Sequence, residues 1–345
     1  MTELKRDKTS FTGVLGSENM DKLRAIKELE SSGGGQLWDN YRALYKSVSN
    51  YKTSLEFPIQ IDFELNATCN LKCPMCPLSV ESNSIKKDFS LSFEIFSKII
   101  DEGVKKGLKA VRLNYLNEPL LRADLEEFIK YAKAKGVLDI YFSTNGMLLD
   151  KKRAESLIKS GLDRIQISID ANSSEVYSQM RPGGKFNKVV QNVLNLVELK
   201  KELNSVTPLV RVNFVRTEIN ESELESFINF WRDKVDMIGA QEMVAPPKST
   251  KDLKSKTTTK MEKFRCSFPN KNLVITAEGN VLPCCTFWGD EMPLGNIYAQ
   301  IKQSGELCIE KFYNCAKMIA LRELHKCGNY QQNEICKKCV EGSLY

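Results

Sequence analysis

The chain has 345 residues, with 50 Lys and Arg against 44 Asp and Glu, so its formal net charge is a mild +6. This length can bury one large core and a smaller one, and the balance of 42% hydrophobic and 27% charged residues is typical of a soluble globular protein. No run of about twenty apolar residues predicts a membrane span, and no dense basic face with interleaved aromatic residues points to nucleic acid.

The first 55 residues predict a helical extension. A helix is expected over 17–30 and, after a glycine-rich break at 31–35, a second helix carries an aromatic stripe from Trp38 to Val48. A stripe of this kind is more typical of packing against a larger body than of a ligand site. The charged N-terminus also lacks the apolar core of a secretory signal.

Residues 56–245 alternate between predicted strands and amphipathic helices, and Ser92 and Asp150 are suitable helix N-caps. Six β/α units predict a parallel sheet with helices outside, and six are fewer than the eight of a closed barrel. The predicted fold class is therefore α/β, a partial (β/α)6 TIM-like barrel. The expected strands are Ile59–Leu65, Ala110–Asn114, Asp139–Ser143, Arg164–Ile169, Leu209–Val215 and Val235–Ala240.

A CxxxCxxC segment follows the first predicted strand, with thiols at Cys69, Cys73 and Cys76. A [4Fe–4S] cluster takes four ligands, so three thiols hold three irons and leave the fourth open for chemistry. A zinc loop or loose surface thiols are the alternative. The spacing and the position after a strand favour the cluster.

The stretch TCNLKCPMCP at residues 68–77 resembles the cluster motif of the radical S-adenosylmethionine (SAM) enzymes. The resemblance implies that SAM chelates the open iron of a [4Fe–4S] cluster and that one electron cleaves it to a 5′-deoxyadenosyl radical. That radical takes a hydrogen atom from a substrate C–H. The family also implies the partial barrel and an electron donor such as a flavodoxin or ferredoxin.

Polar residues follow several predicted strands, at the edge where ligands gather in parallel α/β folds. Glu118-Pro119 resembles the segment with which the family holds the SAM amino group, although Leu116-Asn117 stand where the family has glycines. Arg181 resembles an arginine that pairs with the SAM carboxylate. The SAM contacts that the resemblance implies are Glu118, Ser143, Asn145, Ser168, Asp170 and Arg181.

Residues 246–263 are rich in Lys, Ser and Thr and predict a linker. The last segment, 264–345, then begins a second unit with a hairpin over Asn272–Thr276 and Asn280–Pro283. Four cysteines, two beside this hairpin and two in a CxxC pair, suit one tetrahedral site, for which zinc and [4Fe–4S] both stay open. They are Cys266, Cys284, Cys336 and Cys339.

The spacing of Cys266, Gly279 and Cys284, followed by Leu-Gly-Asn-Ile at 294–297, resembles the C-terminal extensions called SPASM and twitch domains. The dense cysteine run of a full SPASM domain is absent. The resemblance therefore implies a small Fe–S domain with one auxiliary [4Fe–4S] cluster held by the four cysteines named above.

The remaining cysteines are Cys285, Cys308, Cys315 and Cys327. Cys285 is expected to point away from Cys284, and all four are expected to be packing residues. The alternative is a thiol that returns a hydrogen atom to a substrate radical. The single histidine, His325, is expected on a surface helix. Eleven thiols in a long chain without a secretory signal favour metal binding in a reducing cytoplasm.

The leading hypothesis is a radical SAM enzyme that dehydrogenates a small or sugar-like substrate, nucleotide-linked sugars included, with the auxiliary cluster as electron acceptor. Alternatives are a radical epimerase of a sugar or peptide with a cysteine hydrogen donor and a peptide-modifying SPASM maturase. Residues 1–55 are too short for a peptide-recognition domain, which favours a small substrate. The hypothesis of a different class is a zinc-stabilised binding module without catalysis.

Overall fold

The computed structural model describes residues 5–6, 12–15, 20–80, 89–244, 253 and 264–344. The predicted linker therefore lies outside the described residues apart from Leu253, which belongs to one apolar cluster with Met75 and Met180. None of the helices that the structure describes combines the length and the hydrophobicity that a bilayer crossing requires.

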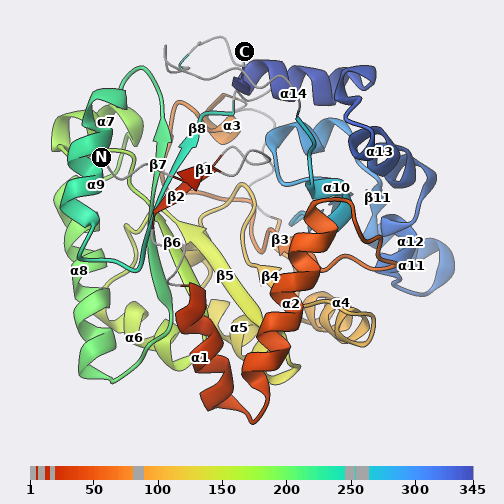
Figure 1. Cartoon of the computed structure of the whole chain (residues 1–345), viewed down its shortest axis with the longest axis horizontal. Coiled ribbons are helices and arrows are strands. Elements are labelled where there is room, and N and C mark those ends of the chain that lie inside the picture. The colour runs from red at the N-terminus through yellow and green to blue at the C-terminus, as the bar shows by residue number, and fades with distance from the viewer. Residues whose placement is uncertain are drawn as a thin grey trace.

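One eleven-stranded sheet runs through the described part of the chain (Figure 1), in the order β1-β2-β8-β7-β6-β5-β4-β3-β9-β10-β11. Its six central strands, β3 to β8, are parallel. This confirms the predicted partial barrel of six β/α units. These strands are β3 Gln60–Phe63, β4 Ala110–Arg112, β5 Asp139–Thr144, β6 Arg164–Ser168, β7 Leu209–Arg216 and β8 Met237–Glu242.

Both edges of the barrel sheet are extended by segments distant in sequence. The predicted C-terminal hairpin, β9 Asn272–Ile275 and β10 Asn280–Leu282, joins through β9, which pairs parallel to β3. At the other edge β2 pairs antiparallel to β8, a pairing that the sequence did not predict. The remaining edge strands are β1 Lys5–Arg6, β2 Thr12–Leu15 and β11 Gly295–Asn296.

Amphipathic helices cover the outer side of the sheet (Figure 1). Ser92 and Asp150 cap two of them as expected, accepting hydrogen bonds from the backbone N–H groups of Ile95 and Arg153. The helices after β3 are α3 Pro77–Val80, α4 Phe93–Lys105, α5 Leu125–Ala134, α6 Lys151–Lys159, α7 Ser174–Met180, α8 Phe186–Glu202 and α9 Leu224–Trp231. Those after β8 are α10 Phe268–Lys271, α11 Ile297–Ser304, α12 Ile309–Tyr313, α13 Ala316–Lys326 and α14 Glu334–Leu344.

Alternation along the strands separates two faces of the sheet. Val210, Val212 and Phe214 of β7 belong to the main apolar core with the helices. The residues between them face the other way, and this side, the inner face, is polar. The inner face carries Asp62, Glu64, Arg112, Asn114, Tyr141, Ser143, Arg164, Gln166, Ser168, Arg211 and Asn213.

The N-terminal helices α1 Met20–Glu30 and α2 Gly34–Ser49 pack at the amino ends of the strands. Trp38 and Tyr41 form an apolar cluster with Ile59, Ala110 and Leu209, which stand at the beginnings of β3, β4 and β7. The Tyr41 hydroxyl also donates to Asp139 at 3.0 Å. The aromatic stripe is thus a packing surface, as predicted.

Candidate functional site

The three thiols of the first motif lie on the loop between β3 and α3. Cys73 is buried and Cys76 partly buried. Burial, followed by the neighbouring thiol groups, raises the pKa of Cys76 to about 12, and burial is also the main cause that raises the pKa of Cys69 and Cys73. Three adjacent thiols that resist ionisation fit a metal centre, because a bound cationic centre supplies the charge that thiolates require.

An arginine and an asparagine lie directly against this loop. Arg181 Nη1 is 3.6 Å from Cys73 Sγ, and Asn145 Nδ2 is 3.9 Å from Cys69 Sγ. Arg181 is held by an ion pair with the fully buried Asp170, whose Oδ1 also accepts from the Val215 N–H at 2.8 Å. The Arg181 Nε atom is buried without a hydrogen-bond partner. One donor of the guanidinium therefore stays available for a ligand beside the cysteines.

Glu118 joins the loops that follow β4 and β5. Its carboxylate accepts from the Thr144 hydroxyl at 2.6 Å, the Asn145 N–H at 2.7 Å and the Leu120 N–H at 3.1 Å. The carboxylate thus already has three internal donors. It fixes the backbone of Asn145 next to the cysteine loop.

The two serines among the expected SAM contacts lie on the inner face. Ser143 Oγ donates to Gln166 at 3.3 Å, and its N–H donates to Asn114 at 2.7 Å. Ser168 pairs in register with Asn213 of β7. The structure therefore brings Glu118, Asn145, Asp170 and Arg181 to the cysteine loop, whereas Ser143 belongs to the polar network below it.

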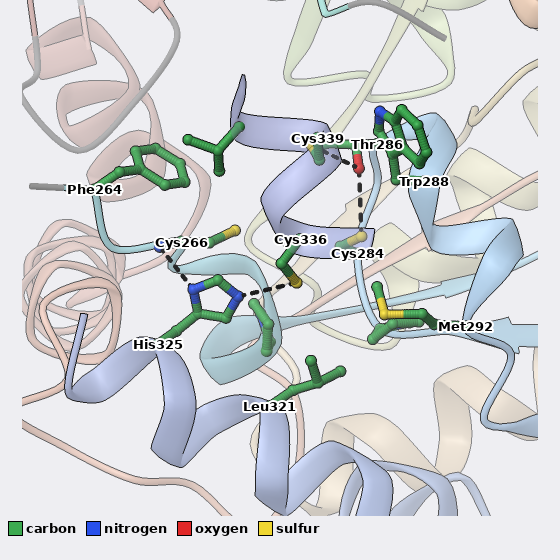
Figure 2. A pocket seen from close by; sticks show the side chains of 13 residues that line it. Phe264, Cys266, Cys284, Thr286, Trp288, Met292, Leu321, His325, Cys336 and Cys339 are labelled. Carbon is green, nitrogen blue, oxygen red and sulfur yellow. Dashed lines mark hydrogen bonds between the residues drawn. The ribbon is translucent and has the colours of Figure 1, made fainter. Parts of the chain in front are cut away.

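The four C-terminal cysteines come together around one pocket (Figure 2), with about 450 Å³ of empty space that is partly open to solvent. Cys336 and Cys339 come from α14, Cys284 follows β10 and Cys266 precedes α10. Phe264, Trp288 and Met292 supply part of an apolar wall. Burial raises the pKa of all four thiols. This donor set fits a metal centre for the same reason as the first.

The spacing of these thiols suits a cluster better than a single zinc ion. Zinc–sulfur bonds of 2.3 Å would put tetrahedral sulfurs about 3.8 Å apart. Among the described residues, only Glu102, Cys308 and Glu310 form a group of three metal-ligand side chains whose ligand atoms all lie within 4.8 Å of one another. No three of the four C-terminal thiols are therefore as close together as a single zinc ion would hold them. The group that contains Cys308 is accounted for by Lys106, which pairs with both carboxylates, and by the Ile309 N–H, which donates to Glu102 at 2.9 Å.

His325 lines the same pocket and is only 1% exposed, so the prediction of a surface position is wrong. The Cys266 N–H donates to His325 Nδ1 at 3.4 Å, so the proton of the neutral ring is on Nε2, which lies 3.4 Å from Cys336 Sγ. Burial lowers the His325 pKa to about 4, so the ring is neutral at pH 7. The missed signal is spacing: Met318, Leu321 and His325 form one buried stripe of α13.

A second polar group reaches the sulfurs from the loop after β10. The Thr286 hydroxyl lies 3.5 Å from Cys284 Sγ and 3.8 Å from Cys339 Sγ. Figure 2 shows His325 and Thr286 approaching the thiols from opposite sides. Three of the four sulfurs therefore have a hydrogen-bonding side chain beside them.

Cys285 lies on the inner face, although Cys284 lines the pocket. It packs with Tyr115, Val274 and Leu282, and Val274 is the register partner of Asp62. Burial raises the pKa of this thiol, with the Asp62 charge as the next cause. The prediction that Cys285 points away from Cys284 and packs is confirmed, but its packing site borders the polar inner face.

Two family models match the chain. Residues 63–230 match the radical SAM superfamily, and residues 266–340 match SPASM, the iron-sulfur cluster-binding domain. Together these matches span most of the chain.

Curated relatives match about half of the chain. The chain is 35% identical over 170 residues to the GTP 3′,8-cyclase of Alkaliphilus oremlandii, covering 48% of this chain and 50% of the relative. It is 31% identical over 172 residues to the probable GTP 3′,8-cyclase of Methanococcus maripaludis, covering 49% of this chain and 54% of the relative. The chain therefore spans about half the length of the curated relatives it matches.

Solved structures share the fold at low identity. Streptococcus suis SuiB bound to S-adenosylmethionine matches with a TM-score of 0.60 and 14% identity, over 89% of this chain and 78% of that one. Native anSMEcpe with bound AdoMet matches with a TM-score of 0.58 and 17% identity, over 82% of this chain and 88% of that one.

The cofactors follow from the two matched families: SAM with its [4Fe–4S] cluster in the barrel, and auxiliary iron–sulfur binding in the SPASM domain. The hypothesis of a zinc-stabilised module without catalysis does not hold. The chain belongs to the radical SAM superfamily and is an enzyme with a C-terminal SPASM domain.

Proposed function

We propose that this enzyme removes two hydrogens from a small, sugar-like substrate and that the auxiliary cluster accepts the second electron. The observation that carries the proposal is that the adjacent residues Cys284 and Cys285 face two different sites. One of these adjacent thiols lines the auxiliary pocket, and the other lies on the inner face beside Asp62. An electron that leaves a substrate radical on the inner face has one residue to cross before it reaches a cluster ligand.

Strand direction supports a substrate position on the inner face. Cys69 comes after the carboxyl end of β3, whereas β10 runs antiparallel to β9 and leads Cys284 back toward the amino end of the same strands. The inner face lies between the two thiol groups. A substrate held there has the SAM site at one end and the auxiliary cluster at the other.

We assign the SAM cluster to Cys69, Cys73 and Cys76, which leave one iron open for SAM. With the cluster and SAM both bound, one-electron reduction of SAM would supply the 5′-deoxyadenosyl radical. Arg181 then offers its guanidinium to the SAM carboxylate from its place beside Cys73, and Asp170 keeps it in that orientation. Glu118 orients Asn145 through the backbone. Ser143 and Ser168, on the inner face, would contact the ribose when SAM is bound.

We assign the auxiliary cluster to Cys266, Cys284, Cys336 and Cys339, which ligate it fully and leave no open iron. The His325 Nε2–H and the Thr286 hydroxyl donate to ligand sulfurs. Such donors stabilise the reduced cluster more than the oxidised one, because the reduced cluster puts more negative charge on sulfur. Both residues therefore favour acceptance of an electron.

Replacing His325 with phenylalanine is expected to lower the reduction potential of the auxiliary cluster. If the His325 hydrogen bond stabilises the reduced cluster by about 1.4 kcal/mol more than the oxidised cluster, its loss lowers the reduction potential by about 59 mV for a one-electron couple. Redox titration of the anaerobically reconstituted protein, followed by electron paramagnetic resonance, measures the shift. Met318→Leu, on the same buried stripe but not among the pocket residues, is the control and keeps the wild-type potential. An unchanged potential in His325→Phe with full iron content contradicts the role.

The proposed reaction is tested by the mass of the product. Reconstituted enzyme, SAM and a chemical reductant are incubated with aminocyclitols, nucleotide sugars and GTP, the last because the curated relatives are named GTP 3′,8-cyclases. Oxidation gives a product about two mass units lighter and one 5′-deoxyadenosine per product. A product of unchanged mass contradicts oxidation.

Epimerisation is the second candidate, and the position of Cys285 favours it. The thiol holds its hydrogen at neutral pH because burial raises its pKa. It would transfer that hydrogen atom to the substrate radical, closing the C–H bond on the opposite face and leaving a sulfur radical. One electron from the auxiliary cluster and one proton would then restore the thiol.

Replacing Cys285 with alanine separates the two candidates. If the enzyme oxidises, product formation changes by less than about threefold; if it epimerises, product formation and solvent deuterium incorporation fall by more than about 100-fold, a loss typical of a missing proton or hydrogen donor. The measurement is product analysis in D2O. Cys315→Ala, a partly buried thiol packed against the main core, is the control for the loss of one sulfur.

The domain limits that we propose are 1–55 for the N-terminal extension, 56–245 for the barrel, 246–263 for the linker and 264–345 for the auxiliary domain. The stretch between the two matched families, residues 231–265, contains the proposed linker. We also propose a cytoplasmic location and a flavodoxin or ferredoxin as the electron donor, since low-potential chemistry needs both a reducing compartment and a one-electron carrier.

A further inference from the structure

Arg211 is a cation that the described chain leaves unpaired. Its neighbours Val210 and Val212 are in the core with the helices, so Arg211 faces inward from β7. Its Nε atom is buried and has no hydrogen-bond partner. Among the residues that the structure describes, no carboxylate forms an ion pair with it.

The other inner-face arginines are already compensated. Arg164 makes two hydrogen bonds of 2.8 Å to Asp139, and Arg112 lies 3.7 Å from Asp62. Burial and the charge of Arg164 lower the Arg211 pKa to about 10. Arg164 and Arg112 therefore each have a carboxylate partner, whereas no carboxylate among the described residues pairs with Arg211. A buried charge without a partner is costly, which indicates a role other than stability.

The side chain of Arg211 extends toward the SAM end of the inner face. A Cβ atom on Gly239 would overlap the Arg211 guanidinium. Gly239 is the register partner of Asn213, which stands two residues nearer the carboxyl end of β7. Glycine at 239 therefore gives the guanidinium room to reach the level of Asn213 and Ser168.

An unused acceptor lies at the same level. Asn213 Oδ1 is buried without a hydrogen-bond partner, while its Nδ2 donates to Gln166 at 3.3 Å. A charged donor and a neutral acceptor are therefore both open on one stretch of the inner face. A ligand that carries an anionic oxygen and a hydroxyl or amine satisfies both.

We propose that Arg211 binds an oxyanion of the substrate, a carboxylate or a phosphate, while Asn213 accepts a hydrogen bond from a hydroxyl or amine of the same molecule. This inference rests on the proposed function, because it assumes that the substrate occupies the inner face. It narrows the substrate class to anionic polyols and amines, such as sugar phosphates, nucleotide-linked sugars and sugar acids.

The test uses the reconstituted protein without reductant, so that binding is measured whether or not any substrate is oxidised. Calorimetric titrations with inorganic phosphate and with acetate distinguish the two oxyanions. Wild type binds at least one of them, and Arg211→Met weakens that binding by at least about tenfold, the loss expected of one charge-assisted contact. Arg232→Met, an exposed arginine just after α9, removes the same charge and keeps wild-type binding.

A second measurement does not depend on any ligand. Replacing an unpaired buried cation with an apolar side chain of similar length is expected to raise the thermal midpoint of the anion-free protein by about 2 °C or more. Binding that is absent in wild type, or equal in Arg211→Met, overturns the inference, and so does a lower midpoint in the variant. Failure of substrate oxidation together with Arg211-dependent anion binding would overturn only the proposed function.

Discussion

Replacing Cys69, Cys73 and Cys76 together with alanine is expected to abolish the formation of 5′-deoxyadenosine from SAM. The three thiols are the proposed ligands of the only cluster that leaves an iron open, and SAM cannot be reduced without contact with that iron. We expect a loss of at least about 10³-fold, equivalent to more than about 4 kcal/mol of barrier. The measurement is chromatographic detection of 5′-deoxyadenosine under reducing, anaerobic conditions.

The matched control removes the same number of sulfurs elsewhere. The Cys308/Cys315/Cys327→Ala variant is expected to cleave SAM at the wild-type rate, because none of these thiols lines either thiol site. Continued 5′-deoxyadenosine formation in the Cys69/Cys73/Cys76 variant would show that the open iron is held by other residues.

Replacing Arg181 with methionine is expected to have the largest effect on stability. Asp170 is 0% exposed and would lose its cationic partner. Breaking a buried pair by removing one member costs about 3–5 kcal/mol, because the remaining charge stays desolvated. SAM binding is expected to fall as well, since the same guanidinium lies beside Cys73.

A double variant separates the charge effect from the loss of packing. Arg181→Met combined with Asp170→Asn removes both charges, and the asparagine oxygen still accepts from the Val215 N–H. The free energy of unfolding in urea should therefore recover by at least about 1 kcal/mol relative to the single variant. A single variant within about 1 kcal/mol of wild type would contradict a structural role for the pair.

The features that could be predicted from the sequence are those set by residues close together in the chain. The six strands and their order follow from the alternation of apolar runs and amphipathic helices, and the CxxxCxxC loop is readable because its three thiols are close in sequence. The hairpin and the CxxC pair were enough to group the four C-terminal cysteines across 74 residues of chain, and all four line one pocket. The choice of iron over zinc came only from the resemblance, because spacing left both metals open.

Non-local pairing accounts for what was missed. No local signal tells that β9 pairs parallel to β3 or that β2 pairs with β8, since both contacts join distant segments. His325 was misplaced because a lone histidine on a helix is usually exposed, whereas here the stripe of Met318 and Leu321 was the better guide. The alternation around Arg211 was visible in the sequence, but the absence of a partner is a property of the folded sheet.

Iron and acid-labile sulfide content after anaerobic reconstitution tests the central claim, one open cluster in the barrel and one closed cluster in the SPASM domain, most directly. Two [4Fe–4S] clusters predict about eight irons in the wild type, and about four in both the Cys69/Cys73/Cys76→Ala variant and the Cys266/Cys284/Cys336/Cys339→Ala variant. A wild type with about four irons that fall to none in the first variant would contradict an auxiliary cluster and remove the proposed electron acceptor.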